Sequence, residues 1–141
     1  MLRRGRIAAS AVLIFSLAAC SSSHHGSAVG SADAQVRAIW SEFFNSLTPV
    51  AKRQQLLEDG AAFTSDLAAE STGGAISVSV GKVSVSDSAH ATVSFSLSVA
   101  PSTHLPSVGG AAVRVDGKWL VSKSTMCAVL AATGRKSSAC S

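Results

Sequence analysis

Hydrophobic residues recur with a helical period in the first part of the chain beyond residue 32. From Asp33, a plausible N-cap, they follow steps of three and four at Val36, Ile39, Trp40, Phe43, Phe44 and Leu47. This spacing predicts an amphipathic helix of about four turns. Thr48-Pro49 favours a second helix over 50–59, which Gly60 would end. A short third helix is expected over 62–69.

The period changes to two after the Ser-Thr-Gly-Gly break at 71–74. Apolar and polar residues alternate over 76–85, where Gly81-Lys82 would form either a β-bulge or a tight hairpin turn. They alternate again over 91–99, as in an antiparallel strand with one buried face. Residues 101–110, with two prolines and two glycines, predict a loop. Asp116-Gly117 predicts a hairpin, and a final helix over 125–133 would be capped by Ser124.

The order of these elements indicates the fold class. Helices come first, a meander of three or four antiparallel strands follows, and a short helix ends the chain. Such segregation is typical of an α+β fold, with the N-terminal helices packed on one face of a curved sheet. We therefore expect a single α+β domain over residues 33–141.

The N-terminus carries the features of an export signal. A basic start precedes an apolar run at 7–17, which is shorter than the ~20 residues of a membrane-spanning helix. Leu17-Ala18-Ala19-Cys20 resembles a bacterial lipobox. We expect a signal peptide over 1–19 and lipidation of Cys20 by a diacylglycerol with acyl chains such as palmitate. The cysteine would anchor the protein to the extracytoplasmic face of the cell membrane.

Residues 20–32 are rich in Ser, Gly and Ala, and they predict a flexible tether between the lipidated cysteine and the domain. His24-His25 within it is expected to be solvated, because two adjacent histidines without a third ligand do not define a metal site. Cys127 and Cys140 remain as a pair if Cys20 is lipidated. Outside the cytoplasm such a pair is expected to form a disulfide that ties the tail to the last helix.

Charge and motifs restrict the function. The chain has 12 basic and 8 acidic residues, but three arginines lie in the export signal, so the exported protein is nearly neutral. Nucleic acid is therefore not an expected partner. None of the common catalytic, phosphate-binding or metal-binding motifs is present, and we expect no cofactor, no metal and no enzymatic activity. Asp66 is the best acid candidate, whereas His90, His104 and Glu42 are expected at the surface or in a loop.

The aromatic residues allow two interpretations. They pack the core, or some of them line an apolar pocket at the mouth of a cone. The residues proposed for such a pocket are Trp40, Phe44, Phe63, Phe95 and Trp119. Both tryptophans should be largely buried, and each indole N–H should find a hydrogen-bond partner because an unpaired buried donor is costly.

The segments 38–60, 77–99 and 115–134 resemble the mycobacterial low-molecular-weight secreted antigen family. The resemblance rests on a Trp-x-x-Phe-Phe helix, a Thr-Pro helix start and a Gly-Lys-Trp-Leu-Val-Ser hairpin before the final helix. It implies a cone of the nuclear-transport-factor-2-like type and export to the cell envelope. Because it has a lipobox-like cysteine, this chain resembles the lipoprotein branch of the family. The family supplies no catalytic residues.

Three functions are consistent with these features. The favoured hypothesis is a lipid-anchored, non-catalytic module that binds a small apolar ligand, a lipid or another envelope protein. An enzyme with an unrecognised active site and a purely structural surface antigen are the alternatives. An open apolar cavity would favour the first, a buried carboxylate–histidine pair the second, and a cone filled by its own side chains the third.

Overall fold

The computed structural model describes residues 31–100 and 102–141. The export signal, Cys20 and the paired histidines of the tether lie outside these residues. The elements, in chain order, are α1 (Ala32–Phe43), α2 (Val50–Gln55), the 3-10 helix η1 (Gly60–Phe63), α3 (Thr64–Thr72), β1 (Ile76–Val85), β2 (His90–Val99), β3 (Thr103–Val115), β4 (Lys118–Val121), α4 (Lys123–Ala132) and the 3-10 helix η2 (Ser138–Cys140).

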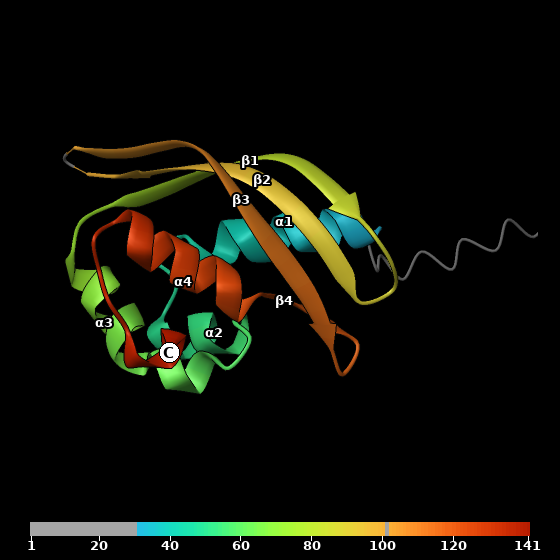
Figure 1. The fold of residues 1–141 in the computed structure, drawn as a ribbon, viewed down its shortest axis with the longest axis horizontal. Helices are drawn as coiled ribbons and strands as arrows, with labels where there is room; N and C mark the ends of the chain where they lie inside the picture. Colours follow the sequence, from blue (N-terminus) through green and yellow to red (C-terminus); the bar gives the residue numbers. More distant parts are fainter. Residues whose placement is uncertain (1–30, 101) are drawn as a thin grey trace, which may run out of the picture.

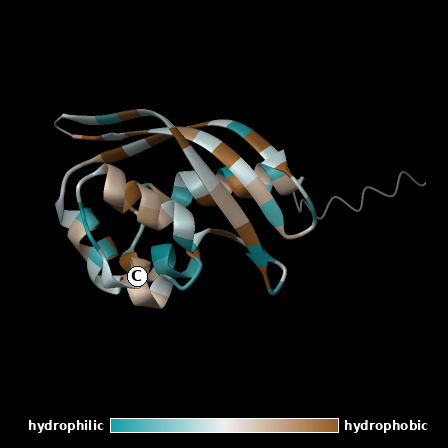
Figure 2. Ribbon diagram, in the orientation of Figure 1, coloured by the Kyte–Doolittle hydropathy of each residue, from teal (hydrophilic) through white to brown (hydrophobic). Residues whose placement is uncertain are grey.

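The four strands form one antiparallel meander in the order β1-β2-β3-β4. The sheet curves, and α1 and α4 pack against it while α2 and α3 lie together at its lower side (Figure 1). The α+β architecture predicted from the order of the elements is therefore confirmed. Hydrophobic and hydrophilic residues alternate along the strands, as Figure 2 shows by the succession of brown and paler or teal bands. Successive side chains point to opposite faces of the sheet, so one face is mainly apolar.

The bulge in β1 is confirmed, and the hairpin alternative is excluded. The pairing of β1 with β2 shifts between Val80 and Val83, so Gly81 and Lys82 together lie opposite the single residue Ser94. The Arg37 guanidinium of α1 donates a 2.7 Å hydrogen bond to the Gly81 carbonyl oxygen. The bulge keeps Val78, Val80 and Val83 on the buried face, as the change from even to odd positions required.

The loop predicted over 101–110 was wrong from Thr103 onward. Strand β3 begins at Thr103 and pairs with the whole second half of β2. The register of β3 against β2 shifts: Phe95 pairs with Val108, whereas Leu97 pairs with Leu105. Pro106 therefore lies in a bulge of β3. A proline is tolerated there because its missing N–H is not needed by the ladder.

Helix boundaries also differ from prediction. Helix α2 ends at Gln55 rather than near residue 59, because the following backbone pairs with β4: the Val121 N–H donates to the Leu56 carbonyl oxygen at 2.8 Å. Ser31, not Asp33, caps α1 by accepting a hydrogen bond from the Ala34 N–H. Ser122, not Ser124, caps α4. The third predicted helix is divided between η1 and α3.

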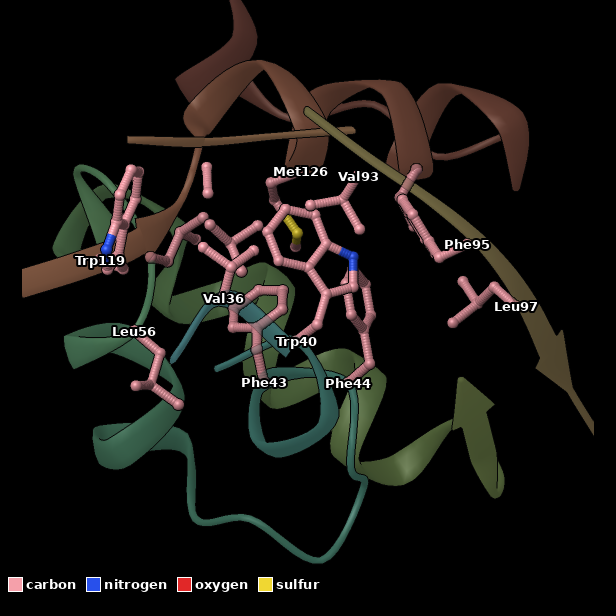
Figure 3. Packing of buried hydrophobic residues seen from close by; sticks show 14 of the residues in the cluster. Val36, Trp40, Phe43, Phe44, Leu56, Val93, Phe95, Leu97, Trp119 and Met126 are labelled. Carbon is pink, nitrogen blue, oxygen red and sulfur yellow. The ribbon is translucent and has the colours of Figure 1, made fainter. Parts of the chain in front are cut away.

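The core is centred on Trp40 of α1, which is wholly buried (Figure 3). Its indole meets the Phe95 ring edge-on with the centroids 5.8 Å apart, and it also contacts Phe44. Gly110 of β3 makes room for it, since a Cβ there would lie 2.9 Å from the indole and 3.0 Å from Phe95. Close approach of a helix side chain to the sheet thus requires glycine at this position.

The expectation for the two tryptophans is half correct. Both are buried, with exposed fractions of 0% for Trp40 and 4% for Trp119. The predicted hydrogen bonds of their indole N–H groups are wrong: within the described residues neither buried nitrogen has a partner. Each unpaired donor costs about 1–3 kcal/mol, so the aromatic packing around the rings must offset that cost.

Candidate binding cavity

A cavity of about 310 Å³ lies where α3 ends, β1 and β3 begin, and β2 ends. In Figure 1 this is the end of the molecule opposite to the start of α1. The residues that line it are Phe44, Ala69, Glu70, Gly73, Ile76, Leu97, Val99, Thr103, Val129, Thr133 and Arg135. Its size is at the lower end of the range of small-molecule pockets.

The apolar wall follows from the strand pattern. Ile76 of β1 and Val99 of β2 are register partners, and Leu97 stands two residues before Val99 on the same face. Helix α4 adds Val129 and α1 adds Phe44 at its C-terminal end. Ile76 and Val99 remain partly exposed, whereas Leu97 and Phe44 are buried. The sheet therefore presents an aliphatic surface to the cavity at the start of β1 and the end of β2.

The five aromatic residues proposed for a pocket lie in different places. Phe44 lines the cavity. Phe95 and Trp119 border two shallow depressions elsewhere, although both side chains are almost wholly buried. Trp40 and Phe63 are wholly buried in the core, and neither lines the cavity. The aromatic group is thus mainly core, because the helix stripe and the inner face of β2 interlock, and aliphatic residues form most of the cavity wall.

A buried charged cluster adjoins the cavity and was missed by the sequence analysis. The Arg53 side chain is wholly buried, and its Nη2 donates to Glu70 Oε2 at 2.6 Å. Its Nε donates to the Phe43 carbonyl oxygen at 2.6 Å, and the guanidinium lies over the Phe43 ring. One signal could have found it: Val50, Arg53 and Leu57 share the helical spacing of a buried stripe.

Asp66, the acid candidate of the sequence, belongs to this cluster. It is 9% exposed, and its Oδ2 accepts a 2.6 Å hydrogen bond from the Ser137 hydroxyl. The Arg135 guanidinium lies 3.9 Å from Asp66 Oδ1 and 3.6 Å from Glu70 Oε1. Both carboxylates are therefore held by cations and hydroxyl groups, and Glu70 alone of the two lines the cavity.

The disulfide between Cys127 and Cys140 is present in the structure and closes the tail onto α4, in agreement with the prediction. Arg135 and Ser137 lie inside the loop that it closes. The Arg135 N–H donates to the Leu130 carbonyl oxygen at 2.8 Å, where α4 ends. The tail thus reaches α3 and supplies the cavity with Arg135.

The histidines lie outside the cavity. His90 is exposed, as expected, and its ring nitrogen is 3.0 Å from Asp87. Hydrogen bonds from the Ala89 N–H and then from His90 lower the pKa of the exposed Asp87 carboxyl. His104 is exposed on β3, where its Nδ1 lies 2.8 Å from the Ser98 hydroxyl. Across the described residues no group of three or more potential metal ligands gathers.

Comparison with known proteins identifies the family of this chain. Residues 28–137 match the family model described as the low molecular weight antigen MTB12, C-terminal domain. The chain is also similar to a crystal structure described as a proposed NTF2-like transpeptidase from Campylobacter jejuni, with a TM-score of 0.41 and 11% sequence identity, over 66% of this chain and 98% of that one. No curated protein matches it. None of the helices among residues 31–100 and 102–141 has the length and apolar character to cross a membrane.

Proposed function

The chain belongs to the family of the low molecular weight antigen MTB12, and we propose that it is a lipid-anchored binding module of the cell envelope. In this proposal the cavity beside β1, β2 and α3 receives the apolar part of a small ligand or lipid. The observation that carries the proposal is the aliphatic wall made by Ile76, Leu97, Val99 and Val129. A domain that filled its cone with its own side chains would leave no such space.

The proposed anchor is Cys20, and its attachment to the extracytoplasmic face of the cell membrane rests on the lipobox pattern. The cavity lies at the end of the domain opposite to the start of α1 (Figure 1). Residues 20–32 would reach at most ~45 Å if fully extended. An anchored domain could thus carry its cavity away from the point of attachment and meet ligands in the envelope space.

The cavity residues favour binding over catalysis. No histidine or cysteine is among them, and the Glu70 carboxylate is paired with the buried Arg53 at 2.6 Å. An enzyme of this fold would need a titratable group free to exchange protons with a substrate in the pocket. The charged cluster instead positions side chains at the rim, which suits the recognition of a ligand.

The test is to fill the cavity with a side chain. Val99→Trp places an indole at a partly exposed position of the apolar wall. Val115→Trp is the matched control, because Val115 is 44% exposed and lies at the far end of the sheet. We expect the purified chain and the control to bind an apolar fluorescent probe, and Val99→Trp to bind it at least tenfold more weakly with an unchanged fold by circular dichroism.

Equal probe binding by Val99→Trp and the native chain would refute the cavity as the binding site. Native mass spectrometry of the protein from its own envelope separates the alternatives further. A retained small molecule or lipid supports the binding module. A retained protein partner with no small molecule would shift the function toward an interaction surface.

A further inference from the structure

The charged residues of the cavity lie on one side of it. Aliphatic residues of the sheet and α4 form most of the wall, whereas its two charged residues, Glu70 and Arg135, come from α3 and the tail. A purely apolar ligand would form no interaction with two charged groups at the edge of its site. The class of ligand therefore depends on which of the two charged groups is still able to bind a polar head group.

The Glu70 carboxylate is already satisfied. Its Oε2 accepts the 2.6 Å hydrogen bond from Arg53, whose side chain is wholly buried and is fixed further by its bond to the Phe43 carbonyl oxygen. Its Oε1 faces the Arg135 guanidinium at 3.6 Å. A cationic group that entered the cavity would have to compete with two guanidinium groups for one carboxylate.

The Arg135 guanidinium is only loosely held. Its one hydrogen bond in the described structure is a 3.3 Å contact from Nη2 to the Asp66 carbonyl oxygen. Its distances to the Asp66 and Glu70 carboxylates, 3.9 and 3.6 Å, are those of ion pairs rather than of hydrogen bonds. A guanidinium carries five N–H donors, and its side chain here is 33% exposed. Most of these donors remain open to a ligand.

The disulfide loop fixes the place of the Arg135 backbone. Cys127 and Cys140 close the loop, the Arg135 N–H is bound to the end of α4, and Ser137 is bound to Asp66 at 2.6 Å. The backbone that carries the guanidinium is thus held at the cavity edge, and the side chain needs only a local adjustment to meet a ligand. Such preorganisation lowers the entropic cost of binding.

From this geometry we infer that the cavity selects an amphiphile with one apolar chain and an acidic head, carboxylate or phosphate, which Arg135 binds. The inference rests on the proposed function, because the apolar chain occupies the same cavity. A planar guanidinium donates two parallel hydrogen bonds to either head group. The apolar wall then takes the chain, and Glu70 and Asp66 keep the guanidinium oriented.

The test uses four probes with the same ten-carbon chain: decanoate, decyl phosphate, decanol and decylammonium. Their affinities for the whole purified chain are measured by isothermal titration calorimetry below micelle-forming concentrations. We expect one or both acidic probes to bind at least tenfold more tightly than decanol, and decylammonium to bind most weakly. The ratio of decanoate to decyl phosphate identifies a free fatty acid or a phosphate-bearing lipid as the preferred source of the head group.

Arg135→Gln is the decisive variant, and Lys136→Gln is its matched control. Lys136 is the next residue of the same loop, is exposed and does not line the cavity. Arg135→Gln should abolish the preference for acidic probes over decanol, while Lys136→Gln should leave all four affinities unchanged. A decrease caused equally by both variants would overturn the inference, because it would mark general surface electrostatics.

The outcomes separate this inference from the proposed function. If decanol binds in the cavity and acidic probes bind no better, the selectivity is refuted while the binding module stands. If decylammonium binds best, Glu70 rather than Arg135 is the determinant, and the inference is overturned. If none of the four probes binds, the proposed function fails and the inference falls with it.

Discussion

Replacement of Arg53 tests whether the charged cluster is a structural necessity of the fold. The Met side chain of Arg53→Met is similarly unbranched and can stay buried. Three interactions are lost: the hydrogen bond to the Phe43 carbonyl oxygen, the ion pair with Glu70 and the contact with the Phe43 ring. The Phe43 carbonyl oxygen and the Glu70 carboxylate would then lack their main partner.

The expected loss follows from burial. Removing one partner of a buried ion pair costs about 3–5 kcal/mol, because the other charge stays in a poorly hydrated place. The Glu70 side chain is 11% exposed and keeps Arg135 at 3.6 Å, which favours the lower end of that range. We therefore expect Arg53→Met to lower the free energy of unfolding by about 3 kcal/mol. That corresponds to a decrease of roughly 12 °C in the melting temperature of a domain of this size.

Lys52→Met is the control, because Lys52 precedes Arg53 on the same helix and is exposed. Its side chain lies 3.8 Å from Glu42, and both side chains are more than two-fifths exposed. Such a surface pair contributes at most about 1 kcal/mol. Urea unfolding followed by circular dichroism gives both free energies. If Arg53→Met unfolds within about 0.5 kcal/mol of the native chain, the reasoning from burial is refuted.

Three further predictions concern the anchor, the disulfide and the core. Cys20→Ser should abolish acyl labelling and leave an uncleaved precursor on a gel; unchanged labelling would exclude the lipobox. Replacing Cys127 and Cys140 by alanine should lower the free energy of unfolding by roughly 3 kcal/mol, since the bridge spans a sequence separation of 13; calorimetry without any decrease would contradict this. Gly110→Ala should cost about 1–3 kcal/mol through overpacking against Trp40, and the added substitution Trp40→Phe should recover part of it.

The sequence predicted the parts of the fold whose signals are local. The stripe through Val36 and Trp40, the alternation of β2 and the Asp116-Gly117 hairpin each depend on neighbouring residues, and all three are confirmed. The first part of β3 was missed because Pro106 and two glycines read as a loop. Its strand conformation comes from pairing with β2, which no local pattern reveals.

The charged cluster was missed for a related reason. Arg53 stands in the polar run 52–55, where each residue reads as solvated, and its carboxylate partner lies 17 residues away. Arg135 and Asp66 are separated by 69 residues. Only the tertiary fold brings α2, α3 and the tail together. Asp66 alone was singled out, since it borders the apolar stripe of Phe63 and Leu67.

The position of the cluster is itself an argument for its role. A buried ion pair is often no more stabilising than well-packed apolar residues of the same volume. Besides Arg53 the buried polar side chains are Asp66, Ser122 and Thr125, and no other described arginine or lysine is buried. A chain selected for stability alone would have little reason to bury Arg53 here. Its carboxylate partner faces the cavity and the second guanidinium, so the cluster is best explained as the support that holds Arg135 at the rim. The proposed recognition of a polar head beside an apolar chain would explain why this cost in stability is retained.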